Sequence, residues 1–274
     1  MARRAGDGAR RTRLAEGSRV ASRCTREASH VQPTQALPLV EQRIVVLPRS
    51  AAGASFARPV AVERPAGLVE ALTRAKERSE AAAPAEPLME AHPALARAAK
   101  GPTKALSAVA VWDSLSRRRD HGLKLPEGIT QAVFASADSH ISEKLRAQYG
   151  GEEGVALAQI VVGQLVLAMV DELTRAAERP HELEHKLSVW AAHDTTMIPV
   201  LVILGCYDFL WPPIASELRL ELWECHEHEE HLVRVVFNDK PLKLPFAAAR
   251  DDFCEVSMLC QALRAKMPDT RASL

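Results

Sequence analysis

His193 and Asp194 are the adjacent residues in this sequence best suited to acid–base chemistry. An imidazole can donate a hydrogen bond to a bound oxyanion, and a carboxyl group can pass a proton to a leaving group. The flanking sequence predicts a strand that ends at Ala192 and a helix that begins just after Asp194. Ligands of α/β folds bind at the carboxyl ends of strands, where the first turn of a helix favours an anion. The structural alternative is that Asp194 only caps the helix.

A second group of chemically capable side chains lies in Cys225–His231 (CHEHEEH), whose residue types bind transition metals. Because this segment joins two predicted strands, we interpret it as a polar connecting loop rather than a metal site. His181 and His185 are four residues apart, but the proline before them favours a solvated turn. The sequence contains no G-x-S-x-G motif, P-loop or dinucleotide-binding fingerprint.

The elements that must position His193 and Asp194 follow from the apolar pattern. Lys186–Ala192 (KLSVWAA) is an apolar run rich in strand formers, which predicts a strand buried on both faces. The helix after the pair extends to about Leu204. The elements predicted downstream are strands at Leu218–Glu224 and His231–Phe237, a turn at Asn238-Asp239, and a helix at Glu255–Lys266.

The chain before these strands is mostly helical, after a short β-like run at Arg43–Leu47. Helical spacing with proline and glycine stops predicts helices at residues 67–84, 87–100, 103–119, 130–149 and 155–177. The longest apolar run, Val155–Val170, is shorter than the roughly 20 residues of a spanning helix, so we expect a core helix and no transmembrane segment. Trp112, Trp190 and Trp223 lie in apolar patterns and are predicted core residues. Strands that flank a helical block predict an α/β fold with a helical insertion or cap.

The composition is that of a globular protein, with 274 residues, 47% of them hydrophobic and 26% charged. The 35 basic and 35 acidic residues give a net charge of zero, which excludes a globally basic nucleic-acid binder. Residues 1–30 contain eight arginines against three acidic residues, a local charge of +5, so the remaining 244 residues carry −5. We expect residues 1–40 to form a disordered Arg-rich leader.

The N-terminus has no apolar h-region, so we predict no secretory signal. Its arginines and serines are typical of an organellar presequence, whereas Asp7, Glu16 and Glu27 argue against one. The default expectation is a cytoplasmic protein, with an organellar presequence as the alternative. The five cysteines include no Cys-x-x-Cys pair, which indicates neither a zinc ribbon nor a dense disulfide framework.

The string from His193 to Glu224 (HDTTMIPVLVILGCYDFLWPPIASELRLELWE) closely resembles the C-terminal half of the histidine acid phosphatases. Residues 110–128 (AVWDSLSRRRDHGLKLPEG) resemble the mid-domain helix and H-x-L-x-LP linker of that family, and residues 233–246 also fit. The resemblance covers about residues 65–266 and is strongest from 186 to 246. It implies a phosphoglycerate-mutase-like sheet flanked by helices, within a domain at residues 41–268 whose mostly helical cap spans 65–150.

The resemblance also implies a phosphate monoester hydrolase of the acid phosphatase type. In the family, a histidine attacks phosphorus to form a phosphohistidine, while arginines clamp the non-bridging oxygens. His193 would add a donor to this phosphate clamp, and Asp194 would protonate the leaving alcohol. No metal or other cofactor is implied. The expected partner is a phosphorylated small-molecule or lipid substrate, and no nucleic acid is expected.

The sequence departs from the family at the nucleophile, because no R-H-G-x-R-x-P motif is present. Arg119–Pro126 (RDHGLKLP) looks similar, but it has an inserted Asp and lies in the stretch that resembles the linker, so we interpret it as a coincidence. Arg43–Ser50 (RIVVLPRS) has a strand and an arginine, but Ser50 stands where the histidine would be. We therefore predict that the N-terminal strand and nucleophile region of the family is missing.

Two hypotheses follow from the missing motif. The first is a phosphomonoesterase that lacks part of its site through truncation or a gene-model error, with activity lowered by orders of magnitude. The second is a non-catalytic family member that binds a phosphate ligand or acts as an interaction module. An Arg-armed regulatory protein is a weaker third idea. Loss of a central strand would also expose sheet edges and favour aggregation.

Overall fold

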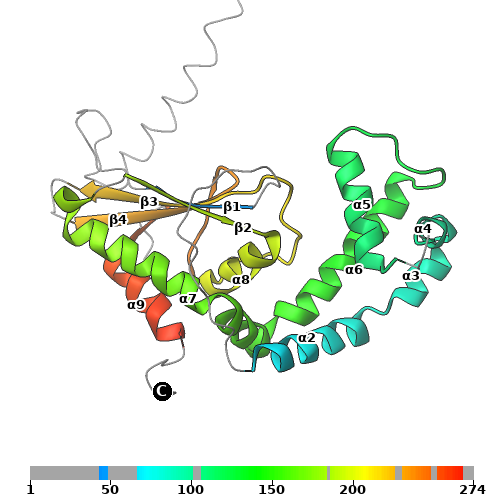
Figure 1. Cartoon of the computed structure of the whole chain (residues 1–274), viewed down its shortest axis with the longest axis horizontal. Coiled ribbons are helices and arrows are strands. Elements are labelled where there is room, and N and C mark those ends of the chain that lie inside the picture. The colour runs from blue at the N-terminus through cyan, green and yellow to red at the C-terminus, as the bar shows by residue number, and fades with distance from the viewer. Residues whose placement is uncertain are drawn as a thin grey trace, which may run out of the picture.

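A computed structural model describes residues 43–48, 67–100, 106–183, 186–225, 230–247 and 252–267 of the chain. The predicted leader at residues 1–40 lies outside these ranges. The described chain has two parts: a β-sheet with helices on one face, and an arm of helices that extends away from it (Figure 1). We call residues 67–150 the helical arm.

The sheet is mixed, and its strands run in the order β2-β1-β3-β4-β5, with β6 paired to β4. Its strands are β1 (Arg43–Pro48), β2 (Leu187–Ala192), β3 (Leu218–Cys225), β4 (Glu230–Phe237), β5 (Lys240–Pro241) and β6 (Phe253–Glu255). Among the described strands, only β1 and β2 pair in parallel, with Pro48 opposite Ala192. The carboxyl ends of β1 and β2 therefore lie side by side.

Strand β1 confirms the β-like run predicted at residues 43–47 and lies in the middle of the sheet, between β2 and β3. The sheet thus has a central strand at this position. What separates the chain from the family pattern is the sequence that follows, Pro48-Arg49-Ser50. Arg49 and Ser50 lie outside the described residues.

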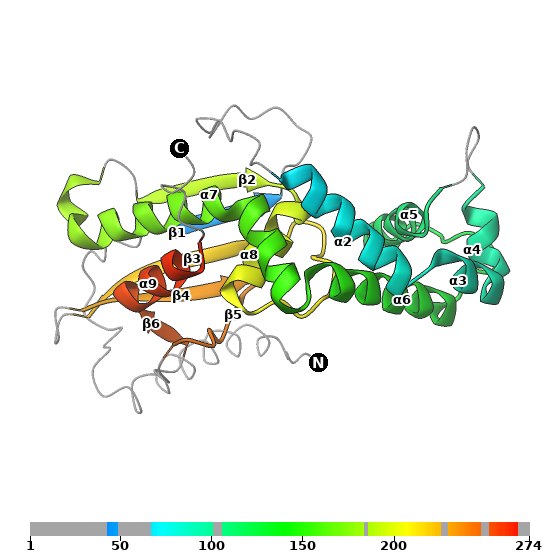
Figure 2. The ribbon, with the colours of Figure 1, turned by 90° about the horizontal axis from the view of Figure 1, so that it is seen from below.

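Three helices cover one face of the sheet: α7 (Gly151–Glu178), α8 (Asp194–Leu204) and α9 (Val256–Lys266) (Figures 1 and 2). The core forms between these helices and the inward side chains of β3 and β4, which are Leu218, Leu220, Leu222, Val233 and Val235. Helix α8 is buried on every side from Met197 to Leu204. It ends at Gly205, whose φ of +76° is left-handed and where a Cβ would lie 2.8 Å from Pro245.

The prediction that β2 is buried on both faces is wrong. Leu187 and Val189 are 52% and 40% exposed, whereas Trp190 and Ala192 pack against the core. The physical reason is that, among the described strands, β2 lies at the edge of the sheet and pairs with β1 alone, and α7–α9 cover one face (Figure 2). An apolar run shows that a segment favours β structure, but not how many neighbours it has.

Helix α7 is 28 residues long, so it extends well beyond the apolar run seen in the sequence. Among the described residues it is the one helix long and apolar enough to cross a membrane, and 44% of its most apolar stretch is buried inside the protein. Buried side chains recur along it, among them Leu157, Val166 and Leu173, and it packs against α8 and α9. This packing is that of the predicted core helix.

The helical arm contains α2 (Leu68–Ala82), α3 (Ala85–Ala91), α4 (Pro93–Ala98), α5 (Ala108–Asp120) and α6 (Gln131–Tyr149). The prediction of a single helix at 87–100 is wrong, because the helix is interrupted at His92 between α3 and α4. Pro93 lacks an N–H and disfavours helical geometry in the residue before it, and His92 accordingly has φ −130° and ψ 80°. Helices α5 and α6 begin where the hydroxyls of Ser107 and Thr130 cap them.

Buried polar contacts hold α2 against α6 in the arm. The Lys144 ammonium lies 2.9 Å from the Glu80 carboxylate and donates to the Ala83 carbonyl at 3.1 Å. His140 lies one turn before Lys144, is 8% exposed, and its Nε2 has no hydrogen-bond partner among the described residues. Burial lowers the pKa of His140, and the charge of Lys144 lowers it further.

Candidate active site

His193 and Asp194 lie where β2 ends and α8 begins, as predicted. His193 occupies the N-cap position, and its carbonyl accepts the N–H groups of Thr196 and Met197 at 2.9 and 3.1 Å. Its side chain is exposed and makes no capping hydrogen bond. Asp194 is the first helical residue, so the alternative in which Asp194 is the N-cap is wrong. The imidazole is therefore left pointing to solvent at the end of the sheet.

The Asp194 carboxylate is half-buried, and each of its oxygens accepts one hydrogen bond. Oδ1 accepts the backbone N–H of Thr195 at 2.7 Å, and Oδ2 accepts the indole N–H of Trp211 at 2.9 Å. Hydrogen bonds to an ionised group are stronger than neutral ones, and the N-terminus of α8 adds a favourable potential. These contacts fix the direction in which the carboxylate points.

Trp211 belongs to the loop at residues 205–217, which joins α8 to β3 and which we call the aromatic loop. Its rings contact the helical arm at three places. The Trp211 and Trp112 ring centroids are 5.5 Å apart, and the Tyr207 and Tyr149 centroids are 6.4 Å apart. The Arg146 guanidinium also lies 4.5 Å from the centre of the Phe209 ring. The aromatic loop therefore links the candidate site to α5 and α6.

The four tryptophans of the chain differ in whether the indole N–H donates a hydrogen bond within the described residues: Trp112 and Trp211 donate one, and Trp190 and Trp223 do not. Trp112 is buried, as predicted, and its indole N–H also donates to Asp138 at 2.5 Å. Trp190 and Trp223 have indole nitrogens without a hydrogen-bond partner among the described residues. Sequence reasoning missed Trp211, although the Trp-Pro-Pro triplet in a loop next to the His-Asp pair was an available signal.

The last turn of α5 places positive charge near Asp194. The hydrogen bond that Arg117 donates to the Asp113 carboxylate raises the pKa of Arg117, and the charges of Asp113 and Asp194 raise it further. The guanidinium is exposed and lies 3.0 Å from the Asp113 carboxylate. The direct partner of the Arg117 guanidinium is thus Asp113, and Asp194 contributes only the smallest of the effects that raise its pKa.

The other predicted site residues are elsewhere or undescribed. Arg119 lies at the end of α5, where it pairs with Asp120 at 3.1 Å, and His121 follows as the C-cap. His181 is exposed in a 3₁₀ turn at Pro180–Glu182. The segments that carry Ser50, His185, His226 and His228 lie outside the described residues. The described part of the chain contains no group of three or more His, Cys, Asp or Glu side chains that could hold a metal ion.

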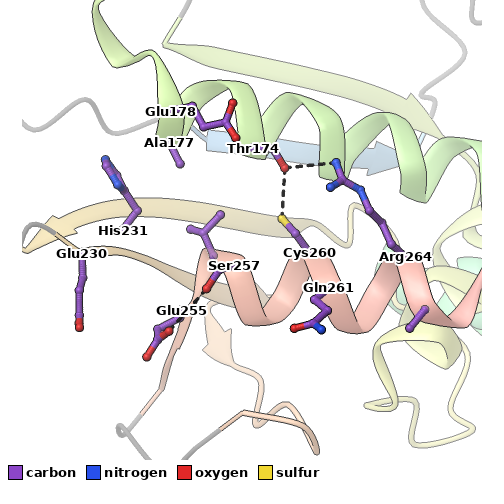
Figure 3. A pocket seen from close by; sticks show the side chains of 12 residues that line it. Thr174, Ala177, Glu178, Glu230, His231, Glu255, Ser257, Cys260, Gln261 and Arg264 are labelled. Atoms are coloured by element: carbon purple, nitrogen blue, oxygen red, sulfur yellow. Dashed lines mark hydrogen bonds between the residues drawn. The ribbon is translucent and has the colours of Figure 1, made fainter.

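A cavity of about 910 Å³ lies at the other end of the sheet, between α7, α9 and the start of β4 (Figure 3). It is lined by Glu178, Glu230, His231, Glu255 and Arg264, among others. Because β4 starts opposite Cys225, where β3 ends, this cavity is remote from the carboxyl end of β2. His193 and Asp194 do not line it, whereas Glu230 and His231 of the segment Cys225–His231 do.

A family model described as the histidine phosphatase superfamily, branch 2, matches residues 49–238, which is more than half of the chain. The chain belongs to this superfamily, and it has the α/β fold with a helical arm that the resemblance implied. The curated relatives are acid phosphatases and other phosphatases of the superfamily.

Lysophosphatidic acid phosphatase type 6 of Pongo abelii is 34% identical over 108 residues, which is 38% of this chain and 24% of the relative. Prostatic acid phosphatase of Homo sapiens is 28% identical over 141 residues, which is 49% of this chain and 36% of the relative. The chain thus spans well under half the length of these relatives. The structure of the phytase from Citrobacter braakii is 11% identical with a TM-score of 0.49, covering 73% of this chain and 66% of that one.

Proposed function

We propose that the chain is an acid-phosphatase-like phosphate monoester hydrolase in which Asp194 is the proton donor and His193 a phosphate-binding residue. The observation that carries the proposal is the fixed Asp194 carboxylate, whose Oδ2 lies 2.9 Å from the Trp211 indole nitrogen beside the exposed His193. The family match over these residues supports the same chemistry. Names of relatives such as lysophosphatidic acid phosphatase favour a phosphorylated small molecule or lipid as substrate.

The reaction breaks the ester P–O bond, and the oxygen that leaves as alkoxide takes the proton from Asp194. His193 donates a hydrogen bond to a phosphoryl oxygen as negative charge develops there. Water supplies the oxygen that ends on phosphate, and the proton that water loses restores the protonated form of Asp194, so that ester and water give alcohol and phosphate. Since the sequence has no nucleophilic histidine motif, we expect turnover to be lower by orders of magnitude than covalent catalysis allows.

The direct test is hydrolysis of an alkyl phosphate, whose leaving oxygen needs a proton, at acid pH by the full chain. We expect slow turnover that falls by about 10²-fold or more in Asp194→Asn and also falls in His193→Ala. Asp171→Asn is the matched control, because Asp171 pairs with Arg264 on the cavity side of the helices. Turnover that survives in Asp194→Asn would contradict the assigned proton donor.

The second candidate is a non-catalytic family member that binds a phosphate ligand. The observation in its favour is that Pro48-Arg49-Ser50 follows the central strand, where the family has its nucleophile motif. This candidate predicts binding of inorganic phosphate, measured by calorimetry, that is weakened in His193→Ala, together with no hydrolysis of p-nitrophenyl phosphate. Measured turnover lost in Asp194→Asn would rule it out.

A further inference from the structure

The contact between Trp211 and Asp194 joins two segments that are 17 residues apart in the chain. The other hydrogen bond of the carboxylate comes from Thr195, the next residue on its own helix. Because both partners of that bond belong to α8, it does not fix the carboxylate relative to any other element. The Trp211 bond instead ties the carboxylate to the aromatic loop, so it sets the direction of Oδ2 relative to the rest of the site.

Trp211 is in turn held by the helical arm. Its ring is tilted by 56° against Trp112 of α5, at a centroid distance of 5.5 Å. Trp112 is 7% exposed, and its own indole N–H donates to Asp138 of α6 at 2.5 Å. A continuous series of contacts therefore runs from α6 through α5 and the aromatic loop to the start of α8.

We propose that Trp211, supported by Trp112, is a positioning residue that aims the Asp194 carboxyl group, so that the helical arm orients the proton donor. The indole N–H is a donor only, and it cannot take the proton that Asp194 transfers. It occupies a lone pair of Oδ2 and leaves the transferable proton to the leaving oxygen. The catalytic consequence rests on the proposed function, whereas the positioning contact does not.

The contact itself is tested without turnover, from the indole N–H signals of the full chain in ¹H–¹⁵N NMR spectra. Trp211→Phe assigns the Trp211 signal. We expect Asp194→Ala to move this signal upfield and to speed its exchange with solvent, because the charged acceptor is gone. Trp112→Phe should also shift it. A Trp211 signal that is unchanged in Asp194→Ala, in a variant that keeps its other indole signals, would overturn the proposal.

The consequence for catalysis is tested by comparing leaving groups. An alkyl phosphate needs a proton on its leaving oxygen, whereas p-nitrophenolate leaves with little help. We expect Trp211→Phe to lower kcat about tenfold for an alkyl phosphate and less than about twofold for p-nitrophenyl phosphate, with KM unchanged. Trp223→Phe is the matched control, because the indole nitrogen of Trp223 has no hydrogen-bond partner among the described residues. It should change kcat for neither substrate.

An equal loss of kcat on both substrates in Trp211→Phe would indicate a merely structural role and would overturn the positioning role. If the wild-type chain hydrolyses neither substrate, the proposed function fails. The NMR result then decides the positioning contact by itself, so the two failures can be told apart.

Discussion

The two ends of the sheet differ in how they are built. At the carboxyl end of β2, the Asp194 carboxylate accepts a hydrogen bond from an indole of the aromatic loop, beside the exposed His193. At the opposite end lies a cavity of about 910 Å³, and its lining includes Glu178, Glu230 and Glu255. These carboxylates make the cavity the poorer place for a phosphate ester.

Charge explains this difference. The Arg264 guanidinium of the cavity already lies 2.8 Å from the Asp171 carboxylate, and the neighbouring glutamates repel an anion. Arg117 at the other end is likewise paired, at 3.0 Å from the Asp113 carboxylate, so the difference in charge lies in the glutamates that line the cavity. Side chains that converge from several elements on one exposed point indicate function better than the volume of a cavity does.

The largest expected effect tests whether the site end depends on packing between parts of the chain. Trp112 is buried and contacts both Trp211 and Asp138, so Trp112→Ala should lower the free energy of unfolding by about 3–5 kcal/mol. At the other end, Arg264→Ala removes an exposed ion pair and should cost less than about 1 kcal/mol. Urea unfolding measures both, and equal costs would break the comparison.

The next effect concerns ligand binding at the two ends. His193→Ala should weaken binding of inorganic phosphate by about tenfold, or ~1.4 kcal/mol, because an exposed donor next to the first turn of α8 is lost. His231→Ala is the matched control in the lining of the cavity and should leave the affinity unchanged. Calorimetry with phosphate measures both constants. A larger loss of affinity in His231→Ala would place the phosphate-binding site in the cavity and contradict this prediction.

A smaller effect comes from acid acting on the arm that supports the site end. The pKa of His140 is lowered in the folded chain, by burial first and then by Lys144, while Glu143 and Glu80 oppose the shift. As the pH falls below about 6.5, the unfolded chain binds the proton first, so the free energy of unfolding falls until the lowered pKa is passed. His140→Gln should lose less stability than wild type between pH 7.5 and 5.5. Urea unfolding at both values checks this, and parallel losses would contradict it.

Sequence patterns predicted much of the fold because the segments concerned are strongly periodic. Alternating leucines predicted β3, and the long apolar runs predicted α7 and α8. The His-Asp pair was also placed correctly, since a strand-to-helix junction is a local feature. By contrast, the break at His92-Pro93 was missed because the helical pattern continues on both sides of it.

Features set by tertiary structure could not be predicted in this way. The exposure of Leu187 and Val189 depends on where β2 lies in the sheet, which its own residues do not specify. The bond from Trp211 to Asp194 depends on the path of the aromatic loop, and that path depends on Trp112 in the distant arm. The position of the His-Asp pair was readable from the sequence, but its contact with Trp211 was not.

The smallest effect tests the backbone of the aromatic loop itself. Ala215 has φ +60°, a left-handed conformation that a side chain disfavours and that glycine adopts freely. Ala215→Gly should therefore raise the free energy of unfolding by up to about 1 kcal/mol, even though glycine makes the unfolded chain more flexible. Ala135→Gly, at an exposed position within α6, is the matched control and should lower it by about 1 kcal/mol. If Ala215→Gly instead destabilises the chain while the Trp211 indole signal stays in place, the loop conformation does not carry this strain. If the Trp211 indole signal also moves toward its position in Asp194→Ala, the methyl group of Ala215 is needed to hold the aromatic loop. The hydrogen bond from Trp211 to Asp194 then depends on contacts of this small side chain as well.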